Sequence, residues 1–290
     1  MNEDEKVKGV TILRQEICVL CLNKATSPHA IRVFQNRNPF PLIANIDIGL
    51  VKDPVDIGSS DDENFFFVID SKEKCVWKVE RQTGDYHKFL QLPFIHFFRW
   101  PSTLSVSCDG KQLLMLTHYS LVVYGALRSE EAAQEELKLP SDIIDPRQAV
   151  ETSSGHFIVL HVLEKDVDVP AGSTEEEKQL IFVVSKVIKD EDKKTKVVLR
   201  FIPQNKTQEL NRPCYLALDS DDQVFVADEY NNRIILLDSD LSWVRIICPI
   251  DDGPRIVALN KLCYDKVERQ LIVVTGAYGR EVSIYRIDLG

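Results

Sequence analysis

A pattern that recurs about every 45 residues restricts the folds that this chain can adopt. Prolines that open an apolar stretch occur at Pro54, Pro101, Pro146 and Pro213. In each repeat a polar turn follows about nine residues later, and then a strongly apolar segment. The 67 residues between Pro146 and Pro213 include two charged segments, VPAGSTEEEKQ and KDEDKK, which we interpret as loop insertions. Extending the period in both directions reaches Lys8 and Leu259, so six repeats fill the chain.

The apolar segments within each repeat are short and rich in valine, isoleucine and phenylalanine. Examples are FFFVID (65–70), LVVYG (121–125) and VFVAD (224–228). Asp-Gly, Ser-Gly and Asn-Asn turns separate them, which is the pattern of antiparallel strands. The segment ALRSEEAAQEELKL (126–139) favours a helix by composition, although it could equally be a long connection between two strands.

Six repeats of this length predict an all-β protein: a single six-bladed β-propeller of antiparallel four-stranded blades covering residues 1–290. A pair of β-sandwiches is the alternative, but it predicts no constant period. The last repeat has room for three strands, so we expect a three-stranded last blade, or one closed by the N-terminus or by a strand from a longer parent chain. The expected blades are 8–49, 50–94, 95–139, 140–207, 208–250 and 251–290.

The clearest repeat, NRPCYLALDSDDQVFVADEYNNRIILLD (211–238), resembles the NHL repeat. Asp222 departs from the pattern, because the family usually has a turn glycine there. The chain is most similar to the NHL propellers at the C-terminus of tripartite-motif (TRIM) proteins. This resemblance implies a domain that selects substrates for a ubiquitin ligase whose catalytic parts lie elsewhere, and RNA recognition is also known in the family. The matching residues are Pro213, Asp219, Val224, Val226, Asp228, Asn231 and Arg233.

Polar side chains recur where the second strand of each repeat is expected to end. A propeller would gather these positions on one face near the central channel, where they could bind a peptide, a nucleotide or a metal ion. Asp70, His118, His161 and Asp228 would then serve a metal-dependent hydrolase or lyase. The alternative is that each side chain caps the turn after its strand. The positions are Asn23, Asp70, His118, His161, Asp228 and Thr275.

The turn DEYNNR (228–233) offers both a structural and a binding interpretation. Pro213, Asp219, Asp228 and Arg233 fit the structural part of the repeat, with Arg233 pairing with a carboxylate such as Asp228. Tyr230, Asn231 and Asn232 would project from a loop with an aromatic ring and amide groups suited to a partner. The candidate partner-binding residues are Asp70, His118, His161, Tyr230, Asn231, Asn232 and Arg233.

Charge and motif content narrow the function further. The formal net charge of −10 disfavours RNA and argues against DNA. Cys18 and Cys21 form a CxxC without a second pair, so we expect no metal site, and no cofactor or catalytic motif is recognisable. The charged start, the scattered cysteines and the lack of a long apolar run predict a cytoplasmic protein without a membrane segment. We therefore expect a non-catalytic recognition domain for a protein or peptide partner.

Overall fold

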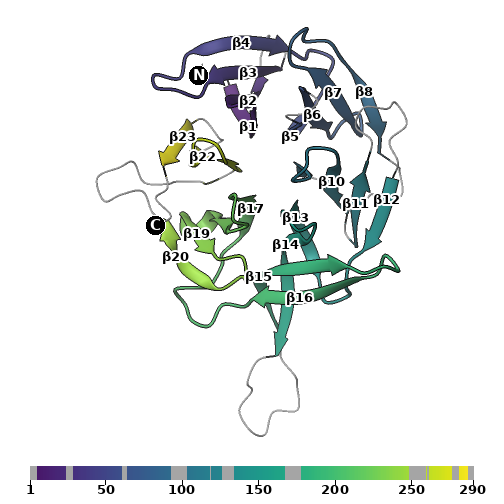
Figure 1. The fold of residues 1–290 in the computed structure, drawn as a ribbon, viewed down its shortest axis with the longest axis vertical. Coiled ribbons are helices and arrows are strands. Elements are labelled where there is room, and N and C mark those ends of the chain that lie inside the picture. The colour runs from purple at the N-terminus through teal and green to yellow at the C-terminus, as the bar shows by residue number, and fades with distance from the viewer. Residues whose placement is uncertain are drawn as a thin grey trace, which may run out of the picture.

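Six antiparallel sheets arranged radially around one axis make up the protein (Figure 1). We call them blades A to F in chain order. They confirm the expected all-β, six-bladed propeller. Within the described part of the chain there is no α-helix, only the 3₁₀ turn η2 (Glu229–Asn231), and no helix long and apolar enough to cross a membrane. The computed structural model describes residues 5–23, 29–60, 64–92, 103–117, 119–125, 134–166, 178–247, 259, 261–275 and 281–286.

Each blade is a meander in which consecutive strands pair antiparallel. Blade A contains β1 (Glu5–Leu13), β2 (Glu16–Asn23), β3 (Ala30–Gln35) and β4 (Leu42–Asp47). Blade B contains β5 (Pro54–Ser60), β6 (Phe65–Asp70), β7 (Cys75–Glu80) and β8 (Tyr86–Gln91). Blade C contains β9 (Leu104–Val106), β10 (Leu113–Leu116), β11 (Ser120–Tyr124) and β12 (Gln134–Lys138). Blade D contains β13 (Ile144–Glu151), β14 (Phe157–Asp166), β15 (Lys178–Lys189) and β16 (Thr195–Phe201). Blade E contains β17 (Pro213–Leu218), β18 (Val224–Asp228), β19 (Arg233–Leu237) and β20 (Trp243–Ile247). Blade F contains β21 (Lys261–Asp265), β22 (Gln270–Thr275) and β23 (Glu281–Arg286).

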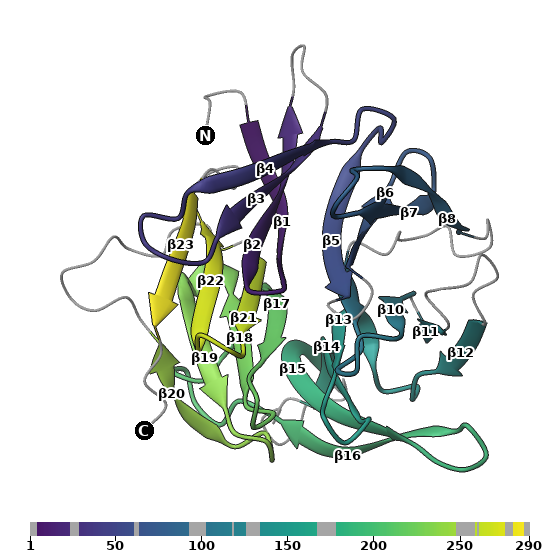
Figure 2. The same cartoon turned by 45° about the horizontal axis from the view of Figure 1, so that its top comes forward.

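The first strand of each blade lies nearest the axis and the fourth lies at the periphery (Figures 1 and 2). Blade F has three strands within the described residues, as the length of the last repeat predicts. The helix suggested by the composition of 126–139 is wrong for the described part of that segment. Residues 134–138 form β12, because Leu137 packs into the core between exposed neighbours, a period of two that suits an outer strand.

Apolar side chains fill the space between adjacent blades rather than one central core. Phe66 and Phe67, neighbours on β6, are both fully buried and belong to different clusters. Phe66 packs between blades A and B, whereas Phe67 packs between blades B and C. Because successive side chains of a strand point to opposite faces of its sheet, the run of phenylalanines at 65–67 packs against the blades on both sides of blade B.

The ring closes through direct contact between the innermost strands of the first and last blades, β1 and β21. Two glycines allow the innermost strands to approach closely. A Cβ atom on Gly9 would lie 2.7 Å from Ile57 Cγ2, and one on Gly58 would lie 2.5 Å from Leu104 Cδ1. A Cβ atom on Gly9 would also lie 3.0 Å from the backbone nitrogen of Ile57, so glycine is needed where blade A meets B. At Gly58 the close atoms belong to the side chains of Leu104 and Val106, which would have to shift.

A buried carboxylate ties four blades together on the axis. Asp56 Oδ2 on β5 accepts hydrogen bonds from the Leu104 backbone N–H at 3.0 Å and from the Tyr215 hydroxyl at 2.5 Å. Asp56 Oδ1 lies 3.2 Å from the ammonium nitrogen of Lys261, which also lies over the Tyr215 ring. Burial, and then the Asp56 carboxylate, raise the pKa of the Tyr215 phenol, which therefore stays a hydrogen-bond donor. We call Asp56, Leu104, Tyr215 and Lys261 the hub cluster.

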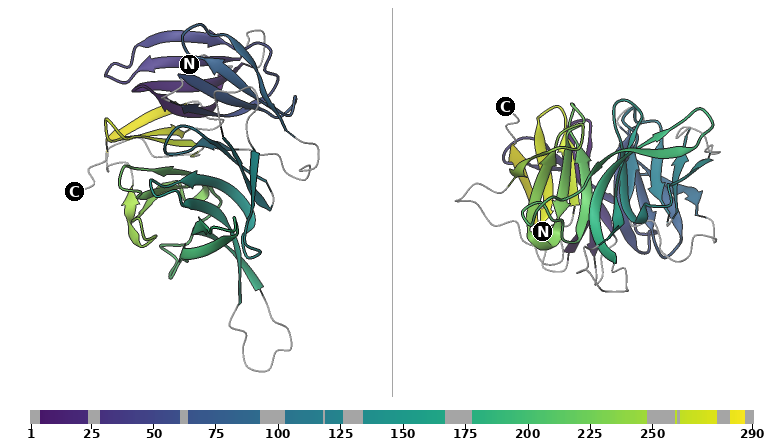
Figure 3. Two further views of the ribbon diagram at one scale, coloured as in Figure 1. Left: turned by 45° about the vertical axis from the view of Figure 1, so that its right-hand side comes forward. Right: turned by 90° about the horizontal axis from the view of Figure 1, so that it is seen from below.

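The strands run between the two faces of a disc, seen edge-on in Figure 3. We call the face with the turns between first and second strands the cavity face, and the face with the loops between second and third strands the far face. Asp222 lies in a cavity-face turn with a φ of 60°, the left-handed conformation that explains the glycine usual in NHL repeats. Its carboxylate accepts hydrogen bonds from the backbone and hydroxyl of Ser153 in blade D. The departure from glycine thus adds a contact between blades D and E.

Replacing Asp56 with Asn should destabilise the protein by about 3–5 kcal/mol, because it leaves the Lys261 ammonium in the hub without a counter-charge. The double variant Asp56→Leu/Lys261→Met should recover only part of the loss, since it removes both charges but leaves the Leu104 N–H and the Tyr215 hydroxyl without their acceptor. Urea unfolding followed by tryptophan fluorescence measures these changes. Lys194→Ala, at a solvent-exposed ion pair with Asp192, is the control and should leave the midpoint unchanged. A small loss in Asp56→Asn would contradict the role of the hub.

Replacing Asp222 with Ala should cost about 1 kcal/mol more than replacing it with Gly, because only alanine adds left-handed strain to the loss of the Ser153 hydrogen bonds. The melting temperatures of the two variants give the order. In a double-mutant cycle, Ser153→Ala should destabilise the wild type more than it destabilises Asp222→Gly. Equal stability of the Ala and Gly variants would refute the backbone argument.

Candidate binding site at the mouth of the central channel

The central channel contains a cavity of about 550 Å³ that opens on the cavity face. All six innermost strands, or the turns that follow them, contribute to its wall. The side chains halfway along the strands are mainly apolar, and polar and charged side chains lie at the turns. The wall includes Val10, Ile57, Val106, Val150, Leu218 and Leu262, and the mouth includes Arg14, Gln15, Cys108, Asp109, Glu151 and Lys266. Tyr215 closes the inner end with its hydroxyl bound to the hub carboxylate.

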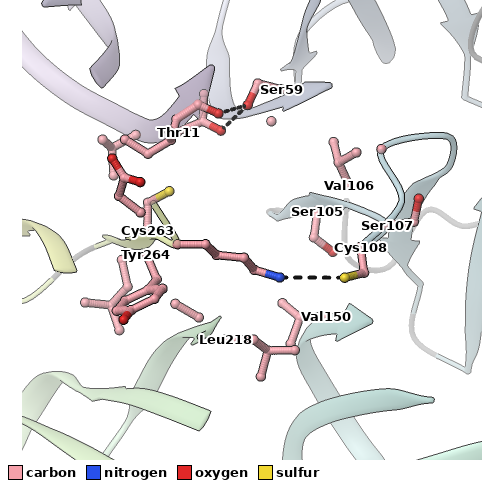
Figure 4. A pocket seen from close by; sticks show the side chains of 18 of the residues that line it. Thr11, Ser59, Ser105, Val106, Ser107, Cys108, Val150, Leu218, Cys263 and Tyr264 are labelled. Atoms are coloured by element: carbon pink, nitrogen blue, oxygen red, sulfur yellow. Dashed lines mark hydrogen bonds between the residues drawn. The ribbon is translucent and has the colours of Figure 1, made fainter. Parts of the chain in front are cut away.

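Two turns from opposite sides of the ring meet across this mouth. The Lys266 ammonium, in the β21–β22 turn of blade F, donates a hydrogen bond to Cys108 Sγ, in the β9–β10 turn of blade C, at 3.6 Å (Figure 4). The backbone N–H of Cys108 donates to Glu151 Oε2 at 3.2 Å. Burial raises the pKa of Glu151, so this carboxyl becomes protonated more readily than an exposed one. The mouth therefore combines a thiol, an amine and a partly desolvated carboxyl group.

The hydroxyl groups deeper in the cavity are already engaged by the protein. Ser59 Oγ donates to the Ile12 carbonyl at 2.6 Å and lies 2.7 Å from Thr11 Oγ1. Ser105 Oγ donates to the Ala149 carbonyl at 2.5 Å. These bonds join neighbouring blades and leave the walls largely without free donors. A ligand that enters the channel would consequently meet apolar walls first and find its polar partners at the mouth.

Asp70 and Asp228, two of the residues proposed from the ends of the second strands, lie at the far face, away from the cavity. Asp70 is fully buried and accepts hydrogen bonds from the backbone of two segments, Lys52 at 2.7 Å and Lys72 at 3.0 Å among them. Burial works to raise the pKa of Asp70, but the hydrogen bonds from the backbone N–H groups of Lys52, Glu73 and Asp53 outweigh it and hold the pKa below its ordinary value. Its described bonds are those of a turn cap.

Asp228 holds the equivalent position in blade E and gathers several predicted residues around itself. It accepts hydrogen bonds from the backbone of Asn211 at 2.7 Å, from the Asn231 side chain at 2.7 Å and from Arg233 Nε at 2.7 Å. Arg233 also donates to the carbonyls of Thr207 and Glu209. Asn232 ends the turn in the left-handed conformation. Pro213 lies opposite Asp228 in the register of β17 and β18, and Asp219 caps the β17–β18 turn through the backbone of Asp221 and Gln223.

His161 is the buried counterpart in blade D, but it lies within its strand and not at the predicted end, because β14 continues to Asp166. Its Nε2 lies 2.7 Å from Ser185 Oγ and its Nδ1 lies 2.7 Å from the Val162 carbonyl. Because a carbonyl only accepts, Nδ1 carries the proton and Nε2 accepts from Ser185. Arg200 donates to the same serine and pairs with Asp142. Burial, chiefly, lowers the pKa of His161 to about 4. Thr275 is buried at the end of β22; His118 and the side chain of Asn23 lie outside the described residues.

Tyr230 is the predicted far-face residue that presents a ring to solvent, with 54% of it exposed. The Arg212 guanidinium lies 4.9 Å from the ring centre and also donates to the tyrosine hydroxyl. Tyr119, in the corresponding loop of blade C, is 70% exposed. Each of these loops therefore offers an aromatic contact, but the described contacts do not bring the two tyrosines together.

No group of three His, Cys, Asp or Glu side chains that could hold a metal ion occurs within the described ranges. Cys18 and Cys21 are both fully buried on β2, where they donate weakly to carbonyls of their own strand.

The cavity was not predicted from the sequence, although the sequence contains a signal for it. The predicted positions are the ends of the second strands, whereas the mouth is formed by the turns that precede those strands. Cys108 and Lys266 each lie one residue after the side chain that caps such a turn, Ser107 or Asp265. Aligning the turns of the six repeats would have selected these positions.

Comparisons with known proteins support the fold. No protein-family model and no curated protein matches the chain. Solved structures do match at 10–13% identity, which shows the fold alone. They include hydrazine synthase from Kuenenia stuttgartiensis (13% identity, TM-score 0.68, 100% of this chain and 97% of that chain), the Cps50 (Swd1) β-propeller domain from Myceliophteria thermophila (12%, 0.58, 98% and 96%) and a nidogen/laminin complex (10%, 0.56, 89% and 90%).

The stability of the protein should fall between pH 6.5 and pH 4 because His161 takes up a proton more readily in the unfolded chain. The contribution of neutral His161 to the free energy of unfolding is present in full above the ordinary pKa of histidine. It is lost as the pH falls towards the pKa of His161 in the folded protein, and the total loss is up to about 3 kcal/mol. Urea unfolding at a series of pH values should show a flatter dependence for His161→Gln. His87→Gln, at an exposed histidine, is the matched control and should keep the wild-type slope. Equal slopes in all three proteins would contradict the assignment.

Proposed function

We propose that this propeller is a non-catalytic recognition domain that binds an extended segment of a partner protein on its cavity face. The observation that carries the proposal is the cavity at the channel mouth, with apolar walls and a polar rim. Its volume of about 550 Å³ leaves room for more than one apolar side chain of an inserted segment, and the rim supplies donors and acceptors for the polypeptide that carries them.

Exposed apolar side chains at the mouth and on the outermost strand of blade A extend the proposed site. Val267, which lines the cavity, is 65% exposed, and Leu42 and Ile43 at the start of β4 are 52% and 45% exposed. The β3–β4 turn of blade A lies against the β21–β22 turn of blade F, because Asn36 donates to Asp265 at 2.5 Å. The A–F junction on the cavity face is thus bordered by the turn that carries Val267 and by the turn that leads into β4. A partner that continues from the channel onto this junction would cover more surface than a small molecule covers.

Three finer expectations belong to the same proposal. The NHL resemblance of residues 211–238 supports a role in choosing substrates for a TRIM-type ubiquitin ligase whose catalytic domains lie on other parts of a parent protein. The net charge of −10 favours a protein over an RNA partner. The scattered cysteines favour a cytoplasmic location. The candidate residues of the far face, with Tyr230 foremost, form the alternative surface for the same function.

Selection of random linear peptides on the purified chain tests the proposal and distinguishes the two faces. Peptides enriched on the wild type should bind Leu218→Trp, which fills the channel, and Val267→Asp at least about tenfold more weakly. Leu218→Met keeps the size of the side chain and Val244→Asp places the same charge on the exposed surface of β20, so both should bind as the wild type does.

Tyr230→Ala reports on the far face and should leave peptide affinity unchanged. Loss of binding in Tyr230→Ala, with full binding in Leu218→Trp, would move the site to the far face. Failure to enrich any peptide, together with salt-sensitive binding of an oligouridine RNA, would replace the proposal with RNA recognition. Circular dichroism and thermal melting establish that each variant is folded.

A further inference from the structure

The thiol of Cys108 and the amine of Lys266, two groups of the polar rim, also contact each other across the mouth of the channel. They lie 158 positions apart in the sequence and come from blades C and F, yet Nζ and Sγ are 3.6 Å apart. Both residues are exposed at the turns around the channel mouth. In Figure 4 a dashed line marks this contact at Cys108, which lies on the same side of the cavity as Ser105 and Val106. Cys263 and Tyr264 lie on the opposite side.

Access to solvent separates Cys108 from the other cysteines of the described residues. Cys18, Cys21 and Cys75 are buried, and Cys214 and Cys263 are half-buried. Burial raises the pKa of Cys75 to about 11 and that of Cys214 to about 12, and it raises the pKa of Cys18 well above its usual value. These thiols remain protonated and shielded at neutral pH, and a protonated thiol is a poor nucleophile. Among the described cysteines, an oxidant dissolved in water therefore meets Cys108 first.

We propose that Cys108 is a site of oxidation by hydroperoxides and that Lys266 captures the oxidised sulfur, forming a covalent link across the channel mouth. In the first step hydrogen peroxide transfers an oxygen atom to the Cys108 sulfur, giving a sulfenic acid and one water. In the second step the Lys266 amine, after losing a proton to solvent, attacks that sulfur. An S–N bond forms, the S–O bond breaks and a second water leaves. Sulfur is oxidised by two electrons and the peroxide is reduced by two electrons.

The link would join two blades that are not neighbours in the ring. Blade C and blade F lie on opposite sides of the channel, so a bond between Cys108 and Lys266 fixes the width of its mouth. It also resists opening of the ring at the A–F junction, because blade F becomes tethered to blade C as well as packed on blade A. The cross-link is independent of the proposed function; only an effect of the link on peptide binding rests on it.

Peptide mass mapping of the 290-residue chain after treatment with hydrogen peroxide at neutral pH tests the proposal. The expected product joins the peptides that contain Cys108 and Lys266 and is about 2 Da lighter than their sum, because two hydrogens are lost. Dithiothreitol should reverse it. In Lys266→Gln the link should be absent, and dimedone, which traps sulfenic acids, should label Cys108 more strongly than in the wild type.

Lys111→Gln is the matched control. Lys111 is closer to Cys108 in the sequence, but its ammonium pairs with Asp109 at 3.4 Å, so this variant should form the link as the wild type does. A link from Cys108 to Lys111, modification of a different cysteine in preference to Cys108, or dimedone labelling that does not change in Lys266→Gln would each overturn the proposal. The melting temperature of the oxidised wild type should rise, whereas that of oxidised Lys266→Gln should not.

Discussion

Closure of the ring depends on what happens at the axis, where six strands from six blades converge and few side chains fit. Asp56 is the acceptor at this point: it binds the backbone of Leu104, the hydroxyl of Tyr215 and the ammonium of Lys261, and so connects blades B, C, E and F. Burying these groups is costly unless each has a partner, so their bonds favour a single arrangement of the blades. Gly9 and Gly58 complete the constraint by letting the innermost strands approach.

The hub also determines where a ligand can enter. Because Tyr215 and its carboxylate partner close the inner end, the space that remains in the channel opens towards the turns between first and second strands. Those turns carry the polar side chains of the mouth, while the loops of the far face use their polar side chains on themselves. Asp70 and Asp228 illustrate the difference: both are fully buried and saturated with hydrogen bonds from nearby residues. The far face therefore holds buried carboxylates that are hydrogen-bonded within the protein, whereas polar side chains at the mouth of the channel, such as Lys266, are exposed to solvent.

The contact between Cys108 and Lys266 and the peptide site proposed around Val267 and Leu218 share this one opening. The proposed cross-link would therefore change peptide binding, and a bound peptide would change access to Cys108, because both involve the turns at the mouth. The similar solved structures share only 12–13% of their residues with this chain, so they support its fold alone. The chemistry at the mouth has to be argued from the residues of this chain.

The number of blades and the antiparallel meander followed from the sequence, because a constant period and short apolar runs are local properties. The bonds around Asp228, Asn231 and Arg233 were equally accessible, since all three residues lie within one turn. Which face carries the cavity was decided by the tertiary structure. Asp56 and Tyr215 are 159 positions apart, and Cys108 and Lys266 are 158 apart. No local pattern encodes such pairs: they meet only because the closed ring brings the starts and ends of six innermost strands to one axis.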